Sequence, residues 1–590
     1  MDVRATTLTQ AFRDTVARCP DRVAVRTIDD TVSLTWAGLA ARVDAVAGGL
    51  ARLGLARGDT CAIMLSNRPE FHVVDLAATM LGATPFSVYQ TLPPDQIAYV
   101  VGDAGARIAI VEPAFLPAMF AARRSLPALE HVIVVGGDAP TGTLPLADVE
   151  GSDPRFDVEA AWRAVTPDDH LTLIYTSGTT GPPKGVQLMH RNIMACARAT
   201  EALVRFEEGT RVISWLPAAH IAERAAHHYL PIVYGFTITS CPNPRDIVSY
   251  LPQVKPNWFF AVPRIWEKMK AGLEARLASL PAEQRTMASQ AIAAAREKVR
   301  LEQAGRPVPA DLADHVARAD ASFFAMVRGM LGLDEAVAVN VGAAPTPPEV
   351  LEFFHAIGLP LGELWGMSET TGSGTVNPPG RMKIGTVGPP VPGVEIKLGP
   401  DSEVFIRGDV VMAGYRNLPE KTAEVLDAAG WLATGDVGEI DADGYLRIVD
   451  RKKELIINSA GKNMSPANIE GTLKGASPLI GQVCVIGDRR AYNTALVVLD
   501  ADFAPVWAAQ QGLTHASLAE LAAEPAMRTA VQEGVERANA LLSRVEQVKK
   551  FHIVAGDWPP GGDELTPTMK LKRRPIAEKY ARDIDAMYTG

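Results

Sequence analysis

A twelve-residue stretch, IYTSGTTGPPKG from Ile174 to Gly185, constrains this chain more than any other segment. It begins inside a short apolar run, Leu171 to Tyr175, which predicts a strand, and continues as a loop of glycines and hydroxyl residues with one lysine. Glycines let backbone N–H groups approach an anion, hydroxyls donate hydrogen bonds, and Lys184 adds a positive charge. The stretch therefore predicts a phosphate-binding loop, and a nucleoside triphosphate is the expected ligand.

Two other interpretations use the same residue types. The loop of P-loop NTPases has Gly, four residues, Gly-Lys and then Ser or Thr. That spacing is absent, because Lys184 follows Pro183 and precedes Gly185. A solvated turn between a strand and a helix is the ordinary interpretation of such a loop. The density of hydroxyls and glycines, with a lysine directly after a strand, favours phosphate binding instead.

The loop resembles the phosphate loop of the AMP-forming adenylating enzymes, which comprise acyl-CoA synthetases, peptide-synthetase adenylation domains and luciferases. The resemblance implies that six residues bind ATP phosphates: Thr176, Ser177, Gly178, Thr179, Thr180 and Lys184. It extends over nearly the whole chain. The Ala-rich, charged stretch 264–333 predicts a solvated helical hairpin rather than a membrane-binding device. A helical insertion here resembles the long-chain and very-long-chain fatty acyl-CoA synthetases.

A second loop, GMSETTG, follows a predicted helix and strand. A carboxylate beside hydroxyls suits Mg²⁺ that bridges phosphates, although an isolated Ser-Glu-Thr is usually a helix cap. Resemblance implies that Glu369 binds Mg²⁺ and that Ser368 lies near the α-phosphate. It also implies an adenine pocket, in which Trp365 replaces the tyrosine of many members, made of Gly342, Ala343, Ala344, Trp365 and Gly366.

Two further motifs match the family in chain order. WLATGDVG resembles the motif whose aspartate, here Asp436, accepts bonds from both ribose hydroxyls, and Arg451 is implied to contact ribose as well. LPAAHIAER resembles a segment of long-chain members that places His220 near the acyl carboxylate, with Ala222 where many have phenylalanine. A structural role for the histidine, or a metal site with Glu223, is the alternative.

Near the C-terminus, LTPTMKLKRR resembles the segment that carries the family's adenylation lysine. The spacing from Thr566 selects Lys570, with Lys572 as the fallback; without the resemblance, a solvated basic tail would be the preferred interpretation. A lysine that reaches both the carboxylate and the α-phosphate would offset their repulsion. The resemblance further implies a hinge at Lys453 and a loop on the coenzyme A side that contains Gly461 and Lys462.

The order of predicted elements indicates the fold class. Short apolar runs alternate with helices up to about residue 341, which predicts an α/β protein of layered, largely parallel sheets with ligands at the carboxyl ends of strands. A β-rich part follows Pro389, with a hairpin turn at Asp443-Gly444. We expect a large N-terminal domain over 1–449 and a small mobile α+β domain over 450–590, whose first helix Ser465 caps.

Composition narrows the function. A chain of 590 residues is too long for one core, and its net charge of -10 argues against a general nucleic-acid binder. Five scattered cysteines without a Cys-x-x-Cys pair predict reduced thiols. The chain shows neither a signal peptide nor an apolar run of spanning length, so we expect a cytoplasmic protein, with peripheral membrane contact and oligomeric state left open.

The motifs together predict an AMP-forming acyl-CoA synthetase that uses ATP, Mg²⁺ and coenzyme A. A carboxylic acid, expected to be a long-chain fatty acid, would become acyl-AMP with release of pyrophosphate and then acyl-CoA. One alternative is a fatty acyl-AMP ligase or adenylation enzyme that loads a separate carrier protein. An alternative of another class is a nucleotide-binding sensor without catalysis.

Overall fold

The computed structural model describes residues 3–589 except 152, 177–181, 460–461 and 514–516. Its first sheet has five parallel strands in the order β4-β3-β5-β6-β7. These strands are Thr60–Met64 (β3), Thr84–Ser87 (β4), Ile108–Val111 (β5), His131–Val134 (β6) and Leu144–Pro145 (β7). Apolar side chains on both faces of the sheet are buried against helices that include α2 (Trp36–Arg52), α3 (Pro69–Met80) and α4 (Pro94–Ala104).

Two four-stranded sheets, β10-β11-β1-β2 and β12-β13-β14-β15, lie beside it. Each has three parallel strands and one antiparallel edge strand, which confirms the largely parallel α/β class. Their strands are Val23–Thr27 (β1), Ser33–Thr35 (β2), Arg211–Ser214 (β10), Thr237–Ser240 (β11), Trp258–Ala261 (β12), Ala338–Val341 (β13), Leu361–Trp365 (β14) and Thr375–Val376 (β15).

The strand before the phosphate loop belongs to an antiparallel hairpin, so the strand-loop-helix interpretation of this segment was wrong. Strand β8 (His170–Thr176) pairs antiparallel with β9 (Lys184–Met189), and Thr176 lies opposite Lys184. Helix α8 (His190–Leu203) begins only after β9. Lys184 is therefore the first residue of a strand, and the hairpin geometry fixes its position relative to Thr176.

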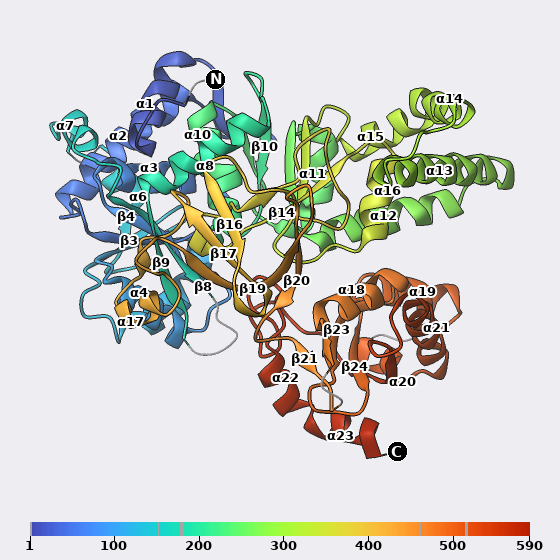
Figure 1. The fold of residues 1–590 in the computed structure, drawn as a ribbon. Helices are drawn as coiled ribbons and strands as arrows, with labels where there is room; N and C mark the ends of the chain where they lie inside the picture. The colour runs from blue at the N-terminus through green and yellow to red at the C-terminus, as the bar shows by residue number, and fades with distance from the viewer. Residues whose placement is uncertain (1–2, 152, 177–181, 460–461, 514–516, 590) are drawn as a thin grey trace.

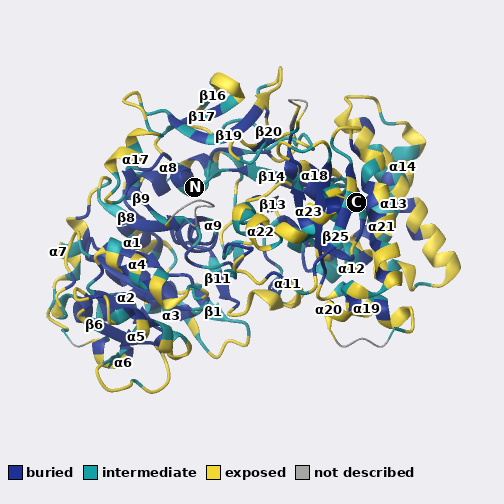
Figure 2. Ribbon diagram, turned by 90° about the horizontal axis from the view of Figure 1, so that it is seen from below, coloured by how far each residue is buried: buried dark blue, intermediate teal, exposed yellow. Residues whose placement is uncertain are grey.

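The stretch 264–333 is helical, as expected. It contains α12 (Pro263–Ala278), α13 (Ala282–Gln303), α14 (Ala310–Ala319), a π-helical turn, η4 (Asp320–Phe324), and α15 (Ala325–Leu331). Alanines 288, 291 and 295 form the buried stripe of α13, which packs on α16 (Pro348–Ala356). Helix α14 buries none of its side chains and is largely exposed in Figure 2. Within the described part of the chain, every helix is too short or too polar to cross a membrane.

An antiparallel sheet, β16-β17-β19-β20, follows. Its strands are Val394–Leu398 (β16), Glu403–Gly408 (β17), Leu432–Ile440 (β19) and Leu446–Arg451 (β20). The predicted turn at Asp443-Gly444 joins β19 to β20, with Gly444 at a φ of 83° that glycine adopts easily. The hairpin places Asp436 opposite Arg451.

The last part of the chain forms a smaller body below the rest in Figure 1. Strands β23 (Ile480–Ile486), β24 (Asn493–Leu499) and β25 (Val548–Ile553) form its sheet, with helices that include α18 (Pro466–Ala476), α19 (Phe503–Gln510), α21 (Pro525–Leu541), α22 (Arg573–Lys579) and α23 (Ala581–Thr589). Ser465 caps α18, as predicted. The first residue in the two apolar clusters of this body is Ile456, and we therefore infer a domain boundary near Asp450.

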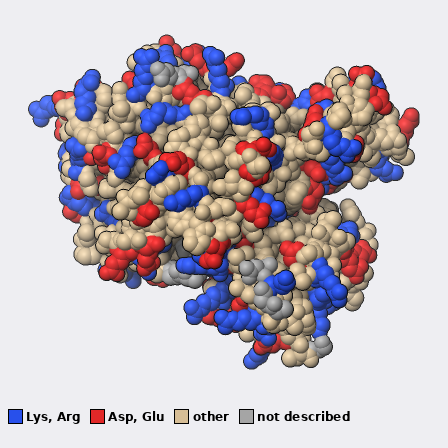
Figure 3. Space-filling view, viewed as in Figure 1, with Lys and Arg blue, Asp and Glu red and all other residues tan. Residues whose placement is uncertain are grey.

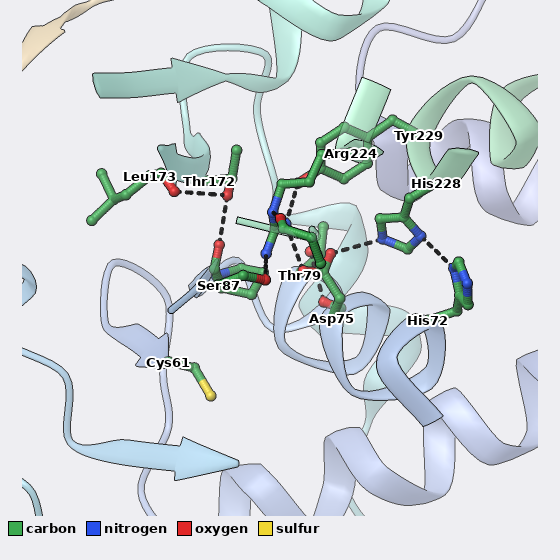
Figure 4. A network of polar contacts seen from close by, with 12 residues as sticks. Cys61, His72, Asp75, Thr79, Ser87, Thr172, Leu173, Arg224, His228 and Tyr229 are labelled. Carbon is green, nitrogen blue, oxygen red and sulfur yellow. Dashed lines mark hydrogen bonds and ion pairs between the residues drawn. The ribbon is translucent and has the colours of Figure 1, made fainter. Parts of the chain in front are cut away.

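A buried polar network joins α3 to the π-helical turn η2 (Arg224–Tyr229) (Figure 4). Asp75 and Arg224 form an ion pair of 2.6 Å in which both side chains are 0% exposed. Arg224 also donates to Ala218 O, Ser87 Oγ and Tyr229 Oη. Because a buried charge is tolerated only when it is paired and hydrogen-bonded, this pair fixes η2 against α3.

Two histidines extend the network. His228 Nε2 lies 2.9 Å from Asp75 Oδ1, and His228 Nδ1 lies 2.9 Å from His72 Nδ1. Burial, with the charge of His228 adding to it, lowers the pKa of His72 well below its ordinary value, so His72 is neutral at pH 7. His228 Nε2–H donates to Asp75, and one of the two facing Nδ1 atoms of His72 and His228 donates to the other. Burial alone would raise the pKa of Asp75, but Arg224 and His228 outweigh it and lower that pKa.

Replacing Asp75 tests the contribution of this pair. Asp75→Asn keeps the shape but leaves the buried Arg224 charge uncompensated, so we expect the free energy of unfolding at pH 7 to fall by about 3 kcal/mol. In the control Asp44→Asn, whose carboxylate is 39% exposed and pairs with Arg13, we expect a loss below about 1 kcal/mol. Urea denaturation measures both.

The same pair predicts a pH dependence. A carboxylate whose folded pKa is lowered contributes its stability above the ordinary value of about 3.9 and loses it as the pH falls. The difference between wild type and Asp75→Asn should therefore hold from pH 7 to about pH 5 and narrow on acidification from about pH 5 toward pH 2. A difference that stays constant, or equal losses in the Asp75 and Asp44 variants, would contradict the role given to the pair.

Candidate active site

The carboxyl ends of two neighbouring parallel strands bring together the residues of the expected adenine pocket. Val341 at the end of β13 pairs with Glu363 of β14, so the loops after both strands leave from the same edge. A Cβ added to Gly342 would lie 2.8 Å from Leu364 Cδ1, and one added to Gly366 would lie 2.4 Å from Gly372 O. Ala343, exposed with Ala344, has an unusual φ of 70°. Both loops thus present backbone closely to the cleft.

Trp365 is the last residue of β14, and it gives the site both a flat ring and a hydrogen-bond donor. Its Nε1–H donates to Asp436 Oδ2 at 2.8 Å, and its side chain is buried. A Cβ on Gly374 would lie 2.7 Å from the indole, so backbone covers part of the ring closely. Arg451 Nε lies 3.0 Å from the other oxygen, Asp436 Oδ1. A carboxylate has about four acceptor sites, so these two contacts leave room for hydroxyl donors.

The carboxylate of Glu369 lies between a tyrosine and several cations. Glu369 is on the short 3-10 helix η5 (Ser368–Thr370) and is 6% exposed. Tyr415, on strand β18 (Gly414–Tyr415), donates its hydroxyl to Glu369 Oε1 at 2.8 Å. Lys184 Nζ lies 3.9 Å from the centre of the Tyr415 ring. The tyrosine thus links the lysine of the phosphate loop to the expected metal ligand, and Ser368 is next to it on η5.

The rest of the phosphate loop is only partly described. Thr176 Oγ1 lies 3.4 Å from the carbonyl of Lys184, while Ser177, Gly178, Thr179 and Thr180 lie outside the described residues. Tyr175 points away from the loop, because its hydroxyl donates to Asp103 at 2.8 Å. Burial lowers the pKa of Lys184, and the nearby charge of Glu369 opposes that effect.

The small body contributes Lys570 to the same cleft. Lys570 lies on a tight loop closed by Thr566 N to Lys570 O at 2.8 Å and Lys570 N to Thr566 Oγ1 at 3.0 Å. Its pKa is lowered, first by burial and then by Arg451, while Asp436 and Glu369 oppose the shift. Lys570 is nevertheless exposed, so water reaches its side chain within the cleft. The fallback residue Lys572 is engaged elsewhere, donating to Gly562 O at 2.8 Å.

His220 lies within electrostatic range of Lys570. Its Nδ1 accepts from Ala222 N at 3.1 Å at the start of α9 (Ile221–Glu223). Burial, and next the charge of Lys570, lowers the pKa of His220 to about 4, so the ring is neutral at pH 7. Glu223 fixes the preceding segment, because its Oε2 accepts from Leu216 N at 2.9 Å. Glu223 also pairs with His227 at 2.7 Å, which is a contact between side chains of one turn.

An apolar cavity of about 220 Å³ opens beside His220. Its lining includes Ala343 and Gly366 of the adenine loops and Val337, just before β13. The rest of its wall includes Leu203, Phe206, Ala222, Leu230, Trp258 and Val339. The expected position of Ala222 on the acyl route agrees with this wall.

The charges of the cleft suit a nucleotide with a divalent cation. Lys184, Arg451 and Lys570 face the carboxylates of Glu369 and Asp436. Within the described residues, no group of three metal-binding side chains occurs. A cation held by Glu369 would therefore share its shell with phosphate oxygens and water, which is how Mg²⁺ is usually bound. Figure 3 shows further Lys and Arg side chains on the small body where it meets the large one.

The expected junction residues lie near the edge of this cluster, and the charge of Lys453 is among those that lower the pKa of Lys184. Lys453 is in the turn after β20, which Glu454 N to Arg451 O closes at 2.9 Å. Lys462 is exposed at the turn between β21 (Ile456–Ile457) and β22 (Asn463–Met464), where its N–H donates to Asn458 Oδ1 at 2.9 Å. Gly461 lies outside the described residues. The hinge and the coenzyme A side stay predictions.

Tyr415 is the site residue that sequence reasoning missed. It follows the apolar run Val410–Met412 and Gly414, a pattern that predicts only a short strand. Its link to Glu369 arises because β18 pairs with β9 and because Met412 N donates to Glu369 O at 2.8 Å. A tyrosine after a glycine in a strand of the expected β-rich part was the only available signal.

Comparisons with known proteins cover both bodies. A family model described as AMP-binding enzyme matches residues 12–416, and one described as AMP-binding enzyme C-terminal domain matches residues 453–590. A putative fatty-acid--CoA ligase fadD11 of Mycobacterium tuberculosis is 48% identical over 76% of this chain and 79% of its own length. The long-chain-fatty-acid--CoA ligase FadD15 of the same species is 35% identical over 96% of this chain and 95% of its own.

A solved structure shows the same fold. The anthranilate CoA ligase AuaEII, in complex with anthranoyl-AMP, superposes with a TM-score of 0.74 at 19% identity, over 98% of both chains. The two matched models, with the two relatives, extend over nearly all of the sequence, including the loops that form the cleft. The chain therefore belongs to the AMP-binding enzyme family.

Proposed function

We propose that this protein activates a long-chain fatty acid with ATP, first to acyl-AMP and then to acyl-CoA. The observation that carries the proposal is the position of Lys570, which lies within electrostatic range of Glu369, Asp436, Arg451 and His220, the last of which lines an apolar cavity. The names of the relatives fadD11 and FadD15 support the choice of acid and acceptor.

The first step joins two anions. A carboxylate oxygen of the acid attacks the α-phosphorus of ATP, and pyrophosphate leaves. Lys570 offsets the repulsion between these groups, and Lys184 with Thr176 and Ser368 binds phosphate oxygens. Mg²⁺ held by Glu369 would neutralise charge on the leaving pyrophosphate. Asp436 and Arg451 bind the ribose, while adenine lies between the backbone of Gly342–Ala344 and that of Trp365–Gly366. Neutral His220 offers a hydrogen bond without repelling Lys570.

The second step transfers the acyl group. The thiol of coenzyme A attacks the carbonyl carbon of acyl-AMP, and AMP leaves. Lys570 has no role in this step and would occupy space near the carbonyl, so we propose that the small body turns about Lys453. The turn would bring the loop with Gly461 and Lys462 toward the cleft. The cytoplasm is the proposed compartment, because all five cysteines are free thiols.

The cavity supports an acid with an alkyl chain. Its wall is mostly apolar and comes from several elements, with Leu203 and Phe206 on one part and Leu230, Trp258 and Val339 on others. A lining of this kind suits an alkyl chain, which makes no hydrogen bonds, better than a polar acid.

A pyrophosphate-release screen tests the function. Purified protein with ATP and Mg²⁺ receives acids from acetate to long fatty acids, each with and without coenzyme A. We expect release that depends on long-chain acids, AMP as the nucleotide product, and acyl-CoA only when the thiol is present. Formation of ADP, or ATP binding without acid-dependent release, would contradict the proposal and favour the sensor. Acyl-AMP that passes to a carrier protein but not to coenzyme A would favour the carrier-loading enzyme.

The role of Lys570 predicts a split between the half-reactions. Lys570→Ala should slow acyl-AMP formation from free acid by about 10²–10³-fold, because the charge that screens the two anions is lost. Conversion of supplied acyl-AMP with coenzyme A should keep its rate. Lys572→Ala is the control, since Lys572 contacts Gly562 O. Unchanged pyrophosphate release in the Lys570 variant would remove this residue from the first step.

The proposed hinge predicts the opposite split. Lys453→Pro fixes φ at the turn after β20, so the small body should lose the second arrangement while it keeps the first. We expect acyl-AMP formation within about twofold of wild type and thioester formation slower by about tenfold or more. Rapid-quench measurement of the rate of each half-reaction tests this prediction. Equal loss of both rates would place the pivot elsewhere.

Tyr415 predicts a change in the Mg²⁺ requirement. Tyr415→Phe removes the hydroxyl that orients Glu369, and loss of such a supporting bond typically costs about tenfold in metal affinity. Half-maximal pyrophosphate release should therefore need about tenfold more Mg²⁺. Tyr445→Phe is a matched control, because Tyr445 also donates a hydroxyl bond and lies 4.6 Å from a lysine, Lys383. Equal Mg²⁺ curves for the two variants would show that Tyr415 does not orient the metal ligand.

A further inference from the structure

The small body also touches the large one at a distance from Lys570, through two ion pairs on α12. Arg264 pairs with Asp500, and Lys268 pairs with Asp502. The two cations are four residues apart and so lie on one face of the helix. The two acids lie in the loop between β24 and α19. Figure 1 shows α12 directly above α18 and α19.

We propose that Arg264 and Lys268 are positioning residues for acyl-AMP formation, because their ion pairs hold the small body where Lys570 faces Glu369. The inference rests on the proposed function. It gives a role in the first step to two residues that lie outside the cleft. Both residues act through Lys570 and touch neither nucleotide nor acid. The first helix of the insertion is thereby part of the adenylation machinery.

The Asp500 pair is the stronger one, because Asp500 is almost completely covered. Its side chain is 7% exposed, against 29% for Arg264. One carboxylate oxygen, Oδ1, accepts from Phe503 N at 2.8 Å and from Asp502 N at 3.1 Å at the start of α19. The other oxygen pairs with Arg264. Asp500 therefore belongs to the fold of the small body, while its second oxygen, among the residues that the structure describes, is compensated by Arg264 of the large body.

This arrangement makes Arg264 selective between two states of the protein. With the bodies together, loss of Arg264 would leave a covered carboxylate without its cation, which is strongly unfavourable. With the small body turned away, Asp500 would face water and need no cation. Removing Arg264 should thus shift the equilibrium between the arrangements rather than unfold either body.

The Lys268–Asp502 pair contributes less to the attraction between the bodies, because it is exposed to solvent. Their side chains are 44% and 75% exposed, so solvent screens the pair. Hydrogen bonding by Lys268, and next its charge, lowers the pKa of Asp502, and Arg264 and Arg245 add to the effect. The acidic loop therefore faces a group of cations on the large body. This exposed pair can be reversed in charge without disturbing a core.

Charge also joins the bodies beside the junction, where Lys452 pairs with Asp401 and Glu403 at 3.1 Å, and two further contacts are close approaches at glycines. A Cβ added to Gly561 would lie 2.8 Å from Thr91 Oγ1, and one added to Gly475 would lie 2.0 Å from Glu349 Oε1. These are close approaches of backbone to side chains and give no long-range attraction. The ion pairs on α12 are thus contacts away from the junction through which charge can draw the bodies together.

The experiment compares both half-reactions in matched variants of the full chain. Arg264→Gln should slow acyl-AMP formation, measured as pyrophosphate release in a single turnover, by about tenfold. Thioester formation from supplied acyl-AMP and coenzyme A should stay equal or become faster. The control is Arg300→Gln, since Arg300 pairs with Glu352 at 2.9 Å within the large body, and it should change neither rate.

A charge exchange gives an independent readout. Lys268→Glu should slow acyl-AMP formation by about threefold, and adding Asp502→Lys should restore it, because the pair is re-formed with opposite signs. Lys298→Glu, which breaks a pair with Glu302 inside α13, is its control. The charge exchange still tests the role of α12 if the Arg264→Gln variant fails to fold.

The outcomes separate the two proposals. Equal loss of both half-reactions, no loss in either, or no recovery in the exchanged pair would overturn the role of α12 while leaving the proposed function intact. Wild-type protein that releases no pyrophosphate with any acid would overturn the proposed function, and this inference with it.

Discussion

Charge compensation in the cleft between the two bodies is the constraint on which the site depends. Glu369 and Asp436 are 6% and 5% exposed, and buried carboxylates need partners. Arg451 pairs with Asp436, Tyr415 donates to Glu369, and Lys184 and Lys570 lie within electrostatic range. The same cations suit a polyphosphate. Without nucleotide they are balanced by carboxylates, so an entering ATP would exchange one set of anionic partners for another.

A second set of buried charges holds the wall of the site in place. The Asp75–Arg224 pair fixes η2 on α3, and Glu223, one residue before Arg224, anchors the segment that leads to His220. A π-helical turn is rare, and here it separates α9 from α10 (Leu230–Tyr234). Leu230 lies on the cavity wall while Arg224 lies in the polar network. The network therefore specifies the shape of an apolar pocket with polar bonds outside it.

Much of this could be predicted from sequence because it is local. The strand before the phosphate loop, the helical character of 264–333 and the Ser465 cap depend on nearby residues and agree with the structure. The hairpin turn at Asp443-Gly444 even places Asp436 opposite Arg451, since the two are nearly equidistant from it. The β8–β9 hairpin was missed, because the short strand KGVQLM after two prolines resembles a helix start as much as a strand. Tyr415 and Glu369 are 46 positions apart, and only the assembled sheets reveal their contact.

The pairs on α12 show why such long-range contacts matter for the two-step reaction. Trp266, Met269 and Leu273 bury one face of α12 in the core of the large body, so Arg264 and Lys268 project from a fixed support. Asp500 is equally fixed by capping α19. Since neither partner can follow the other, the pairs can form in one arrangement of the bodies and must break in any other. An interaction of this kind favours one step of a reaction without touching its chemistry, and its strength must stay modest, because a tighter pair would slow the turn that the next step requires.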